Sequence, residues 1–314
     1  MLRGIRDRKV ASTYRRLTPD KDGRIRTVLA PDTASFRMSS SNSLLFRSTN
    51  LQNMEKKVSK IDPEYKVRDI FVADEGCELV ACDYVGAEAF CCAAYSKDWS
   101  YLAKLEAGVD THAELAKFMF ETEITPIQRD IAKTIRYASQ YAAKVRTITL
   151  NLNKEADTTG MYFTEDQVTV LHHKLLQVHP LELWWDTTRR ELERQNGVLW
   201  NCFGYKRTFH NPDADERLKE GLSFYPQSTI AWLMNRALPQ VHDILEDDCG
   251  IDAMLLLQIH DELLFQALPH AIPALIQTVT PLLTTPFTIH DRTLSIPVEW
   301  KTGHSWGSMK KLEL

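Results

Sequence analysis

A run of charged and aromatic residues at intervals of four is the pattern in this sequence that points most directly to chemistry. Residues four apart stack on one side of a helix. In the segment 128–141 that side consists of Arg129, Lys133, Tyr137 and Tyr141. Two cations a turn apart would bind phosphates, and the rings would lie beneath a base and a sugar. A solvated helix side has the same residue types, so this interpretation depends on the rest of the chain. The opposite side is apolar and is expected to pack inward; it holds Ile131, Ile135, Ala138 and Ala142.

An acidic residue follows an apolar segment that predicts a short strand. Residues 70–73 and 79–82 are expected to form two strands joined by a turn, and the second strand runs into Asp83 and Tyr84. Glu88 follows five residues later, in the first turn of a predicted helix. A carboxylate is therefore expected at the point where a strand ends and the chain turns into a helix.

A second acidic residue lies at the tip of a predicted hairpin. Residues 254–259 and 263–268 are strongly apolar and predict two buried strands, with His260, Asp261 and Glu262 between them. If Asp261 and the strand-end carboxylate share a sheet face, they would hold Mg²⁺, which takes oxygen ligands and bridges substrate phosphates. Two such ions about 4 Å apart clamp the attacking and leaving oxygens of a phosphoryl transfer. An ordinary polar turn would have the same composition.

The elements that must position these residues are mostly helices between residues 98 and 240. A helix start is expected at Asp110 and Thr111, immediately before His112. Residues 31–54 are rich in Ser, Thr and Asn and predict a loop. Its small hydrogen-bond donors, with Arg37, could line a sugar-phosphate backbone, but a plain surface loop would have the same composition. The other expected elements are a long amphipathic helical stretch over 164–196, a hairpin over 199–207, a helix over 226–245 that carries Gln227, a helix over 270–284 and a strand near 296–300.

The composition of the 314 residues is that of a soluble globular protein, with 25% charged and 44% hydrophobic residues. None of the six cysteines lies in a CxxC pair or a zinc-binding spacing, which predicts reduced thiols in a cytosol-like compartment. No apolar run reaches the roughly 20 residues that a membrane helix needs. Residues 1–60 hold 14 Lys and Arg against 5 Asp and Glu, although the whole chain has a net charge of -4. This basic segment predicts either a polyanion site or a solvated arm.

Three motifs in chain order resemble those of family A DNA polymerases, the bacterial polymerase I type. Residues 83–88, DYVGAE, resemble the family's DYSQIE motif, and residues 258–262, QIHDE, resemble its QVHDE motif. The four residues of the predicted helix side match the family's nucleotide-binding helix RxxxKxxxFGxxYG, with Tyr in place of Phe. The resemblance extends from about residue 10 to 310, with lesser matches to TGRLSS, NLQN and DIH at 33–40, 50–53 and 110–112.

The resemblance implies how such a site would work. Asp83 and Asp261, with the backbone carbonyl of Tyr84, would bind two Mg²⁺ ions, for which Mn²⁺ would substitute. Lys133 would also be catalytic, because it would protonate the leaving pyrophosphate. The implied nucleotide-binding residues are His112, Arg129 and Lys133 at the phosphates, Tyr137 stacked on the nucleotide, Glu88 against the sugar 2′ position, and Tyr84. The implied template- and primer-binding residues are Arg37, Gln52, Tyr141, Gln227, His260 and Glu262.

The chain departs from the family pattern at several positions. Val85 and Gly86 replace Ser and Gln, Ala138 and Ala142 stand where the family's helix has Gly, and residues 42–49 resemble an insertion of phage-type members. Family members carry a thumb, and usually a 3′–5′ exonuclease domain, ahead of the matching region. We therefore expect both to be absent, so that synthesis proceeds without proofreading. Either a second polypeptide supplies the thumb or exonuclease, or the chain works distributively.

Together these observations predict an α+β fold, in which a palm with an antiparallel sheet carries an inserted helical fingers subdomain. The expected palm covers residues 1–92 and 223–314, and the fingers cover 93–222, with the nucleotide-binding helix at about 127–142. The predicted activity is template-directed DNA synthesis from deoxynucleoside triphosphates on primer-template DNA, in replication or repair. The predicted location is the cytoplasm, at the nucleoid, or the host cytoplasm for a viral protein, without a membrane partner.

Two other functions are compatible with parts of the pattern. A non-catalytic subunit of a polymerase assembly would bind primer-template without needing Asp83, Asp261 and Lys133. A two-metal nuclease would need the carboxylates but would have no use for the cationic helix side. Extension that depends on magnesium would distinguish synthesis from both.

Overall fold

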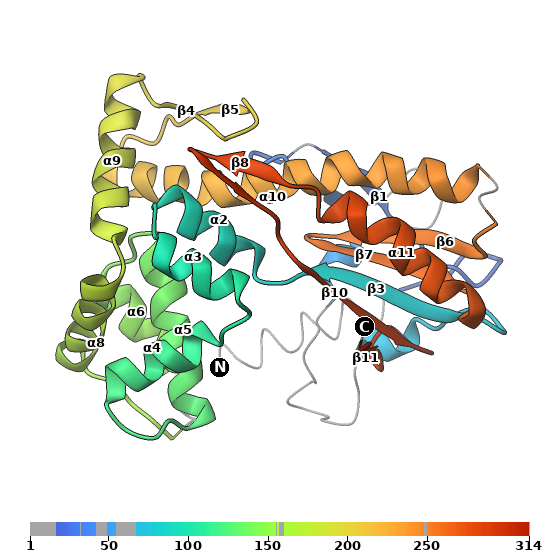
Figure 1. The fold of residues 1–314 in the computed structure, drawn as a ribbon, viewed down its shortest axis with the longest axis horizontal. Helices are drawn as coiled ribbons and strands as arrows, with labels where there is room; N and C mark the ends of the chain where they lie inside the picture. The colour runs from blue at the N-terminus through green and yellow to red at the C-terminus, as the bar shows by residue number, and fades with distance from the viewer. Residues whose placement is uncertain are drawn as a thin grey trace. The chain divides into compact units, whose positions relative to one another are not determined.

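The computed structural model describes residues 17–31, 33–41, 49–54, 67–154, 156, 160–247 and 250–313. Much of the basic segment 1–60, and most of the expected insertion at 42–49, lie outside the described residues. The chain forms two compact units (Figure 1). The first unit comprises residues 1–85, 231–285 and 295–314, and the second comprises residues 86–230 and 286–294.

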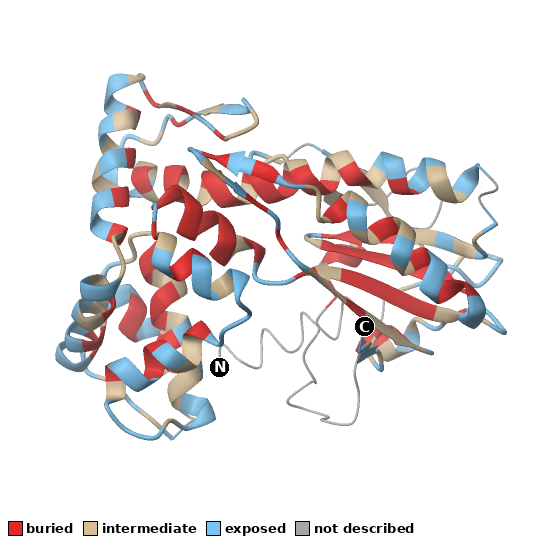
Figure 2. Cartoon of the chain, viewed as in Figure 1, coloured by how far each residue is buried: buried red, intermediate tan, exposed pale blue. Residues whose placement is uncertain are grey.

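A five-stranded antiparallel sheet forms the centre of the first unit, in the order β11-β10-β3-β7-β6. β7 is buried along its whole length and β3 along most of its length (Figure 2). Strands covered on both faces are expected to be continuous apolar runs, as these are. The strands are β3 (Glu78–Tyr84), β6 (Ala253–Ile259), β7 (Glu262–Ala267), β10 (Val298–Gly303) and β11 (Lys310–Lys311). The unit also contains β1 (Val28–Ala30), β2 (Ser39–Ser41), the 3-10 helices η1 (Leu51–Asn53), η2 (Val67–Ile70) and η3 (Pro269–Ala271), and the helix α11 (Ile272–Leu283).

The two faces of this sheet are covered by different elements. On one face, apolar side chains that include Leu264 form a core with Leu51 and Trp306. On the other face, the rings of Phe265 and Trp300 stack at 6.0 Å, and the indole N–H of Trp300 donates to the hydroxyl of Thr280 on α11 at 3.0 Å. Burial from both sides anchors the middle strands, so that the residues at their ends have fixed positions.

The second unit is mainly helical (Figure 1). Polar side chains begin several of its helices, because the first backbone N–H groups of a helix have no partner within the helix. Asp98 caps α3, Asp110 caps α4, and Thr125 and Thr164 form capping boxes at α5 and α8. The helices are α2 (Ala87–Tyr95), α3 (Trp99–Glu106), α4 (Thr111–Phe120), α5 (Pro126–Gln140), α6 (Val145–Asn153), α8 (Glu165–Val178), α9 (Leu181–Arg194) and α10 (Ala214–Glu246). α10 continues into the first unit. Two hairpins pair β4 (Val198–Trp200) with β5 (Lys206–Thr208) and β8 (Phe287–Ile289) with β9 (Arg292–Leu294).

The predicted mixture of an antiparallel sheet with a helical insertion is confirmed, but the strand expected at 70–73 is wrong. That segment contains the end of η2 and a single bridge from Val72 to Ser305. Val72 is 55% exposed, so pairing this segment as a strand would be stabilised little by burial of its apolar side chains. No helix in the described parts of the chain is long and apolar enough to cross a membrane.

The amphipathic stretch expected over 164–196 is helical but is divided into two helices, α8 and α9. Pro180 ends α8, since proline disfavours helical backbone in the residue before it, and His179 is extended with φ −131° and ψ 131°. The helix expected from residue 226 instead begins at residue 214 and passes through Pro226. A proline that would suit a helix start therefore lies in a helix interior.

Candidate active site

Three carboxylates lie side by side at one end of the sheet in the first unit. Glu262 on β7 pairs with Asp83 on β3, and Asp83 pairs with Glu299 on β10. Residues directly opposite each other on antiparallel strands point to the same face. The side chain of Asp83 is 17% exposed and that of Glu262 is 4% exposed. Asp83 is therefore the more accessible of these two carboxylates.

The hairpin of β6 and β7 brings Asp261 to the same end of the sheet. His260 and Asp261 form a two-residue connection between the strands, and His260 takes a left-handed φ of 55°. The backbone N–H of Tyr84 donates to the backbone carbonyl of Asp261 at 3.2 Å. The structure therefore brings together Asp83 and Asp261, which are far apart in the sequence.

Cationic side chains balance part of this negative charge. The ammonium of Lys301 is 2.5 Å from Oε1 of Glu299 and 3.9 Å from Oδ2 of Asp83. Burial opposes the charged form of Lys301, but the hydrogen bond to Glu299 and the charge of Asp83 outweigh it and raise its pKa. Nη1 of Arg68, which is buried, is 3.8 Å from Oε1 of Glu262. Glu262 is thus matched by a buried cation and Glu299 by Lys301 and Lys311, so Asp83 and Asp261 are the carboxylates of this group with the weaker cationic pairing.

The oxygen atoms at this end of the sheet suit a hard divalent cation. Mg²⁺ is usually held by one or two carboxylates together with water and substrate phosphates, and Asp83 and Asp261 would supply such carboxylates. The hydroxyl of Tyr84 donates to the carbonyl of Leu283 at 2.8 Å, so the backbone carbonyl is the group of Tyr84 that would serve as a ligand. Within the described residues, no cluster of three or more His, Cys, Asp or Glu side chains is arranged to hold a metal ion.

A cationic surface lies on α4 and α5 of the second unit. Nε of Arg129 is 2.7 Å from Oδ2 of Asp110, the residue that caps α4. Lys133 is exposed, and in the described part of the chain it takes part in no ion pair. Burial, together with the neighbouring charges of Arg136, Lys133 and Arg129, lowers the pKa of His112 to about 4. The structure therefore brings together His112, Arg129 and Lys133.

An aromatic ring adjoins these three basic side chains. Tyr137 follows Lys133 by one helical turn, and its ring centroid is 5.7 Å from that of His112. Burial is the main cause that raises the pKa of Tyr137 to about 12, so its hydroxyl is protonated at neutral pH. A half-buried ring beside three basic side chains could stack on a nucleotide whose phosphates those side chains bind.

The prediction that Tyr141 and Ala142 continue this helix is wrong, because α5 ends at Gln140. Ala142 has a left-handed φ of 51°, which stops the helix. Tyr141 is next to Glu88, which lies in the first turn of α2. Burial raises the pKa of Tyr141, as do the neighbouring Cys92 thiol and Glu88 carboxylate. Glu88 and Tyr141 thus lie together, although Tyr141 is not on the helix.

Comparison with known proteins decides which family has these features. The family model described as "DNA polymerase family A" matches residues 5–308. The chain belongs to DNA polymerase family A.

Bacterial DNA polymerases are among the relatives of this family A chain. It is 27% identical over 319 residues to DNA polymerase I of Chloroflexus aurantiacus, covering 98% of this chain and 32% of the relative. It is 28% identical to the thermostable DNA polymerase I of Thermus aquaticus, covering 96% of this chain and 35% of the relative. The chain therefore spans about a third of the length of these relatives.

A solved family A structure has the same fold. The polymerase domain of Pol1 from M. smegmatis, in complex with DNA primer-template and dNTP, superposes with a TM-score of 0.80 at 23% identity. The superposition covers 97% of this chain and 52% of that chain. The likeness supports the assignment of the described elements to one polymerase fold.

The residues that the family resemblance implies for primer-template binding have different surroundings. Arg37 is half-buried in the loop between β1 and β2, and the side-chain amide of Asn235 fixes this loop by donating to the carbonyl of Phe36 at 2.9 Å. His260 is exposed at its hairpin tip, and Gln227 is half-buried on α10. The amide of Gln52 is occupied within the fold, because Gln52 is buried and donates to Gln258 at 3.2 Å.

The sequence patterns missed several charged residues of this family A chain. Arg68 and Lys301 pair with the carboxylates of the sheet, although nothing in their sequence surroundings indicates this. Arg136 lies on the buried side of α5, where the helical period predicts apolar residues. A charged residue on the apolar side of an amphipathic helix is a signal that it has a buried partner, and this signal was present in the sequence.

Proposed function

We propose that the chain transfers deoxynucleotides from their triphosphates to the 3′-hydroxyl of a primer, as directed by a template strand, in DNA replication or repair. The observation that carries the proposal is the meeting of Asp83 and Asp261 at one end of the sheet in a member of DNA polymerase family A. The cationic surface of α4 and α5 supports it, because the triphosphate of the incoming nucleotide needs such a surface.

The carboxylates would hold two Mg²⁺ ions, with Mn²⁺ as a substitute. When bound, such ions neutralise charge on the attacking and leaving oxygens of a phosphoryl transfer. Asp83, Asp261 and the Tyr84 carbonyl would bind them, since all three supply oxygen ligands. Lys301 and Lys311 would neutralise Glu299, whereas the contact between Asp83 and Lys301 is longer, at 3.9 Å, so that Asp83 would offer its charge to the metal.

The second unit would bind the incoming nucleotide. Arg129, Lys133 and His112 would bind the triphosphate, and Lys133 would donate a proton to the pyrophosphate as it leaves, because it is exposed and cationic. Tyr137 would stack on the nucleotide. Glu88 would exclude a ribose 2′-hydroxyl, and the protein would act mainly by positioning and charge neutralisation.

Primer-template DNA would be the second partner. The solved M. smegmatis relative binds DNA primer-template and dNTP, and we propose the same partner classes for this chain. Arg37 and His260 would contact the primer-template from the first unit, and Gln227 and Tyr141 from the second. Glu262, which pairs with Arg68, would hold the hairpin end in place beside the primer.

The test of this function is removal of the carboxylate charge at constant shape. In Asp83→Asn and Asp261→Asn, primer extension with Mg²⁺ should fall at least about a thousand-fold, because several kcal/mol of transition-state stabilisation are lost. The affinity for primer-template DNA should change by less than about threefold, since phosphate contacts by cationic groups dominate it.

A matched control and three outcomes complete the experiment. Asp252→Asn is the control, because Asp252 lies at the opposite end of β6 and pairs with His270; it should extend primers normally. Extension near the wild-type rate by Asp83→Asn would refute the metal assignment. A wild-type chain that binds DNA without extending it would favour the non-catalytic subunit. DNA shortened without added nucleotides would favour the nuclease.

A further inference from the structure

Arg136 is a buried cation in the helix that carries the nucleotide-binding candidates. Its exposed fraction is 3%, and it lies on the inward side of α5 beside Ile135. Lys133 and Tyr137, on either side of it in the sequence, have exposed and half-buried side chains. Burying a guanidinium costs free energy unless the charge is paired or hydrogen-bonded, so the partners of Arg136 determine how α5 is held.

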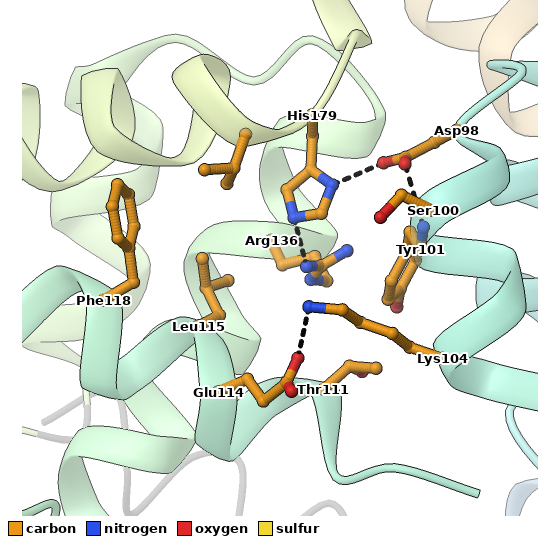
Figure 3. A pocket seen from close by; sticks show the side chains of 11 residues that line it. Asp98, Ser100, Tyr101, Lys104, Thr111, Glu114, Leu115, Phe118, Arg136 and His179 are labelled. Atoms are coloured by element: carbon orange, nitrogen blue, oxygen red, sulfur yellow. Dashed lines mark hydrogen bonds and ion pairs between the residues drawn. The ribbon is translucent and has the colours of Figure 1, made fainter. Parts of the chain in front are cut away.

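A relay of three side chains, Asp98, His179 and Arg136, supplies these partners (Figure 3). Nη2 of Arg136 donates to Nε2 of His179 at 2.5 Å, and Nδ1 of His179 donates to Oδ2 of Asp98. His179 is therefore neutral, with its proton on Nδ1, because Nε2 must accept from a guanidinium that only donates. The guanidinium also lies 3.8 Å from the centre of the Tyr101 ring, a cation–π contact.

The relay joins three helices of the second unit. Asp98 is the N-cap of α3, where its Oδ1 accepts from the backbone N–H of Tyr101 at 3.0 Å. His179 is the C-cap of α8, and Arg136 lies in the last two turns of α5. The relay thus links the position of α5 to two helix ends that carry none of the nucleotide-binding candidates.

A cavity of about 390 Å³ adjoins the relay and gives Arg136 room to move. Within the described residues, Nε of Arg136 and the hydroxyl of Tyr101 have no hydrogen-bond partner, although both are buried. The guanidinium is therefore oriented mainly by His179 and the Tyr101 ring. The cavity lining includes Tyr101, Lys104, Thr111, Glu114, Arg136 and His179.

We propose that Arg136 is a positioning residue that sets α5 for binding the nucleotide triphosphate, and that the relay releases α5 when His179 takes up a proton. This inference rests on the proposed function, because it concerns nucleotide binding by the same helix. A proton on Nε2 turns the acceptor of Arg136 into a donor. The hydrogen bond is then lost, and two cations face each other beside the cavity.

The charges around His179 favour its neutral form at pH 7. Burial is the main cause that lowers its pKa from the ordinary value of 6.5, and Arg136 and Lys104 lower it further, whereas Asp98 raises it. Glu114 faces the same cavity and is paired with Lys104 at 2.6 Å. Because the folded protein binds this proton less readily than the unfolded chain, stability should fall as the pH decreases below about 6.5.

Two substitutions of His179 distinguish an effect of the relay's hydrogen bonds from a general effect on packing. In His179→Gln, the amide oxygen can accept from Arg136 while the amide N–H donates to Asp98, but the amide takes up no proton at the pH values tested. In His179→Leu, both bonds are lost. At pH 7.5 we expect the KM for deoxynucleotides to be within about twofold of wild type in His179→Gln and about tenfold higher in His179→Leu, with a smaller change in kcat, since one charge-assisted hydrogen bond is removed.

The pH profile is the measurement that a merely structural role would not affect. As the pH falls from 7.5 to 5.5, the KM of the wild type should rise relative to that of His179→Gln, towards the roughly tenfold limit set by loss of one charge-assisted hydrogen bond. Because the pKa of His179 is lowered, most of the rise should come at the acidic end of this range. The comparison removes effects common to both proteins, such as titration of the nucleotide phosphates. Parallel pH profiles in the two proteins would overturn the proposal.

Tyr225→Phe is the matched control for loss of stability in the same unit. It removes a partly buried hydrogen bond from the Tyr225 hydroxyl to Glu191 at 2.9 Å. This bond does not touch α5, so the KM should be unchanged. A KM increase in this control as large as in His179→Leu would overturn the proposal. A wild type that extends no primer would count against the proposed function, whereas an active wild type with an unchanged KM in His179→Leu would count against the relay alone.

Discussion

Ala142 shows how one residue can shape the end of the nucleotide-binding helix. Its φ of 51° is left-handed, a conformation that costs a non-glycine residue roughly 1–2 kcal/mol. The family pattern has glycine at this position and at the position of Ala138, which lies within α5. The two alanines therefore occupy different backbone conformations, and a glycine would have opposite effects at the two positions.

Glycine substitutions at these two alanines should change the stability of the protein in opposite directions. Ala142→Gly should stabilise the protein by up to about 1 kcal/mol, because relief of the left-handed strain exceeds the entropy gained by the unfolded chain. Ala138→Gly should destabilise it by about 1 kcal/mol, the usual cost of glycine in a helix interior. Chemical denaturation measures both, and a loss of stability in Ala142→Gly would show that the strain is relieved in some other way.

At the scale of elements, α5 has two sides with separate tasks. Its outward side carries Arg129, Lys133 and Tyr137, and its buried side carries Arg136 between apolar residues. The N-terminus is held by a capping box, in which the hydroxyl of Thr125 accepts from the backbone of Gln128 at 3.2 Å and the Gln128 side chain accepts from the backbone of Thr125 at 2.8 Å. Arg129 follows this cap directly, so its position depends on the first turn.

Removal of the cap should therefore affect both stability and nucleotide binding. Thr125→Ala should cost about 1 kcal/mol of stability, as is typical for an N-cap, and should weaken nucleotide binding, because the first turn that carries Arg129 frays. Thr164→Ala is the control, since Thr164 forms the same capping box at α8, which carries no nucleotide-binding candidate. Equal effects of the two substitutions on nucleotide affinity, measured by calorimetry, would contradict this role of the cap.

At the scale of the whole molecule, the proposed functions divide between two compact units. The candidate metal ligands Asp83 and Asp261 belong to the first unit, whereas the candidate phosphate ligands Arg129, Lys133 and His112 belong to the second. The chain passes between the units several times, and α10 is shared by both. Variants of the metal ligands should therefore change the rate of extension, whereas variants of the phosphate ligands should change the affinity for the nucleotide.

A double variant tests this division. Lys133→Ala should raise the Kd for the nucleotide at least about tenfold, because a charge-assisted phosphate contact is lost. Asp83→Asn should leave that Kd within about threefold and reduce the rate, since its charge acts on the reacting oxygens. The double variant should combine the affinity of the first with the rate of the second. The control is Lys117→Ala, which changes an exposed lysine in the last turn of α4. If the Kd and the rate of the double variant differ strongly from this combination, nucleotide binding and metal binding are not separate tasks.

Local sequence patterns are enough to predict most elements and the places in the chain where the carboxylates lie. The period of four in α5, the apolar strands around Asp261 and the strand that ends at Tyr84 are local patterns, and the structure has these elements. Such patterns are readable because helix and strand periods follow from backbone geometry alone. They do not show that residues 164–196 break at Pro180, because the apolar period continues across the proline.

Tertiary structure alone decided which distant charges meet. Arg136 and His179 are 43 positions apart, and His179 and Asp98 are 81 positions apart, yet the packing of α3, α5 and α8 makes them one relay. The register of β3 and β10 likewise places Glu299 beside Asp83. The reason is physical: a buried charge is stable only where the fold brings it a partner, and that partner comes from chain packing, which no local sequence pattern specifies.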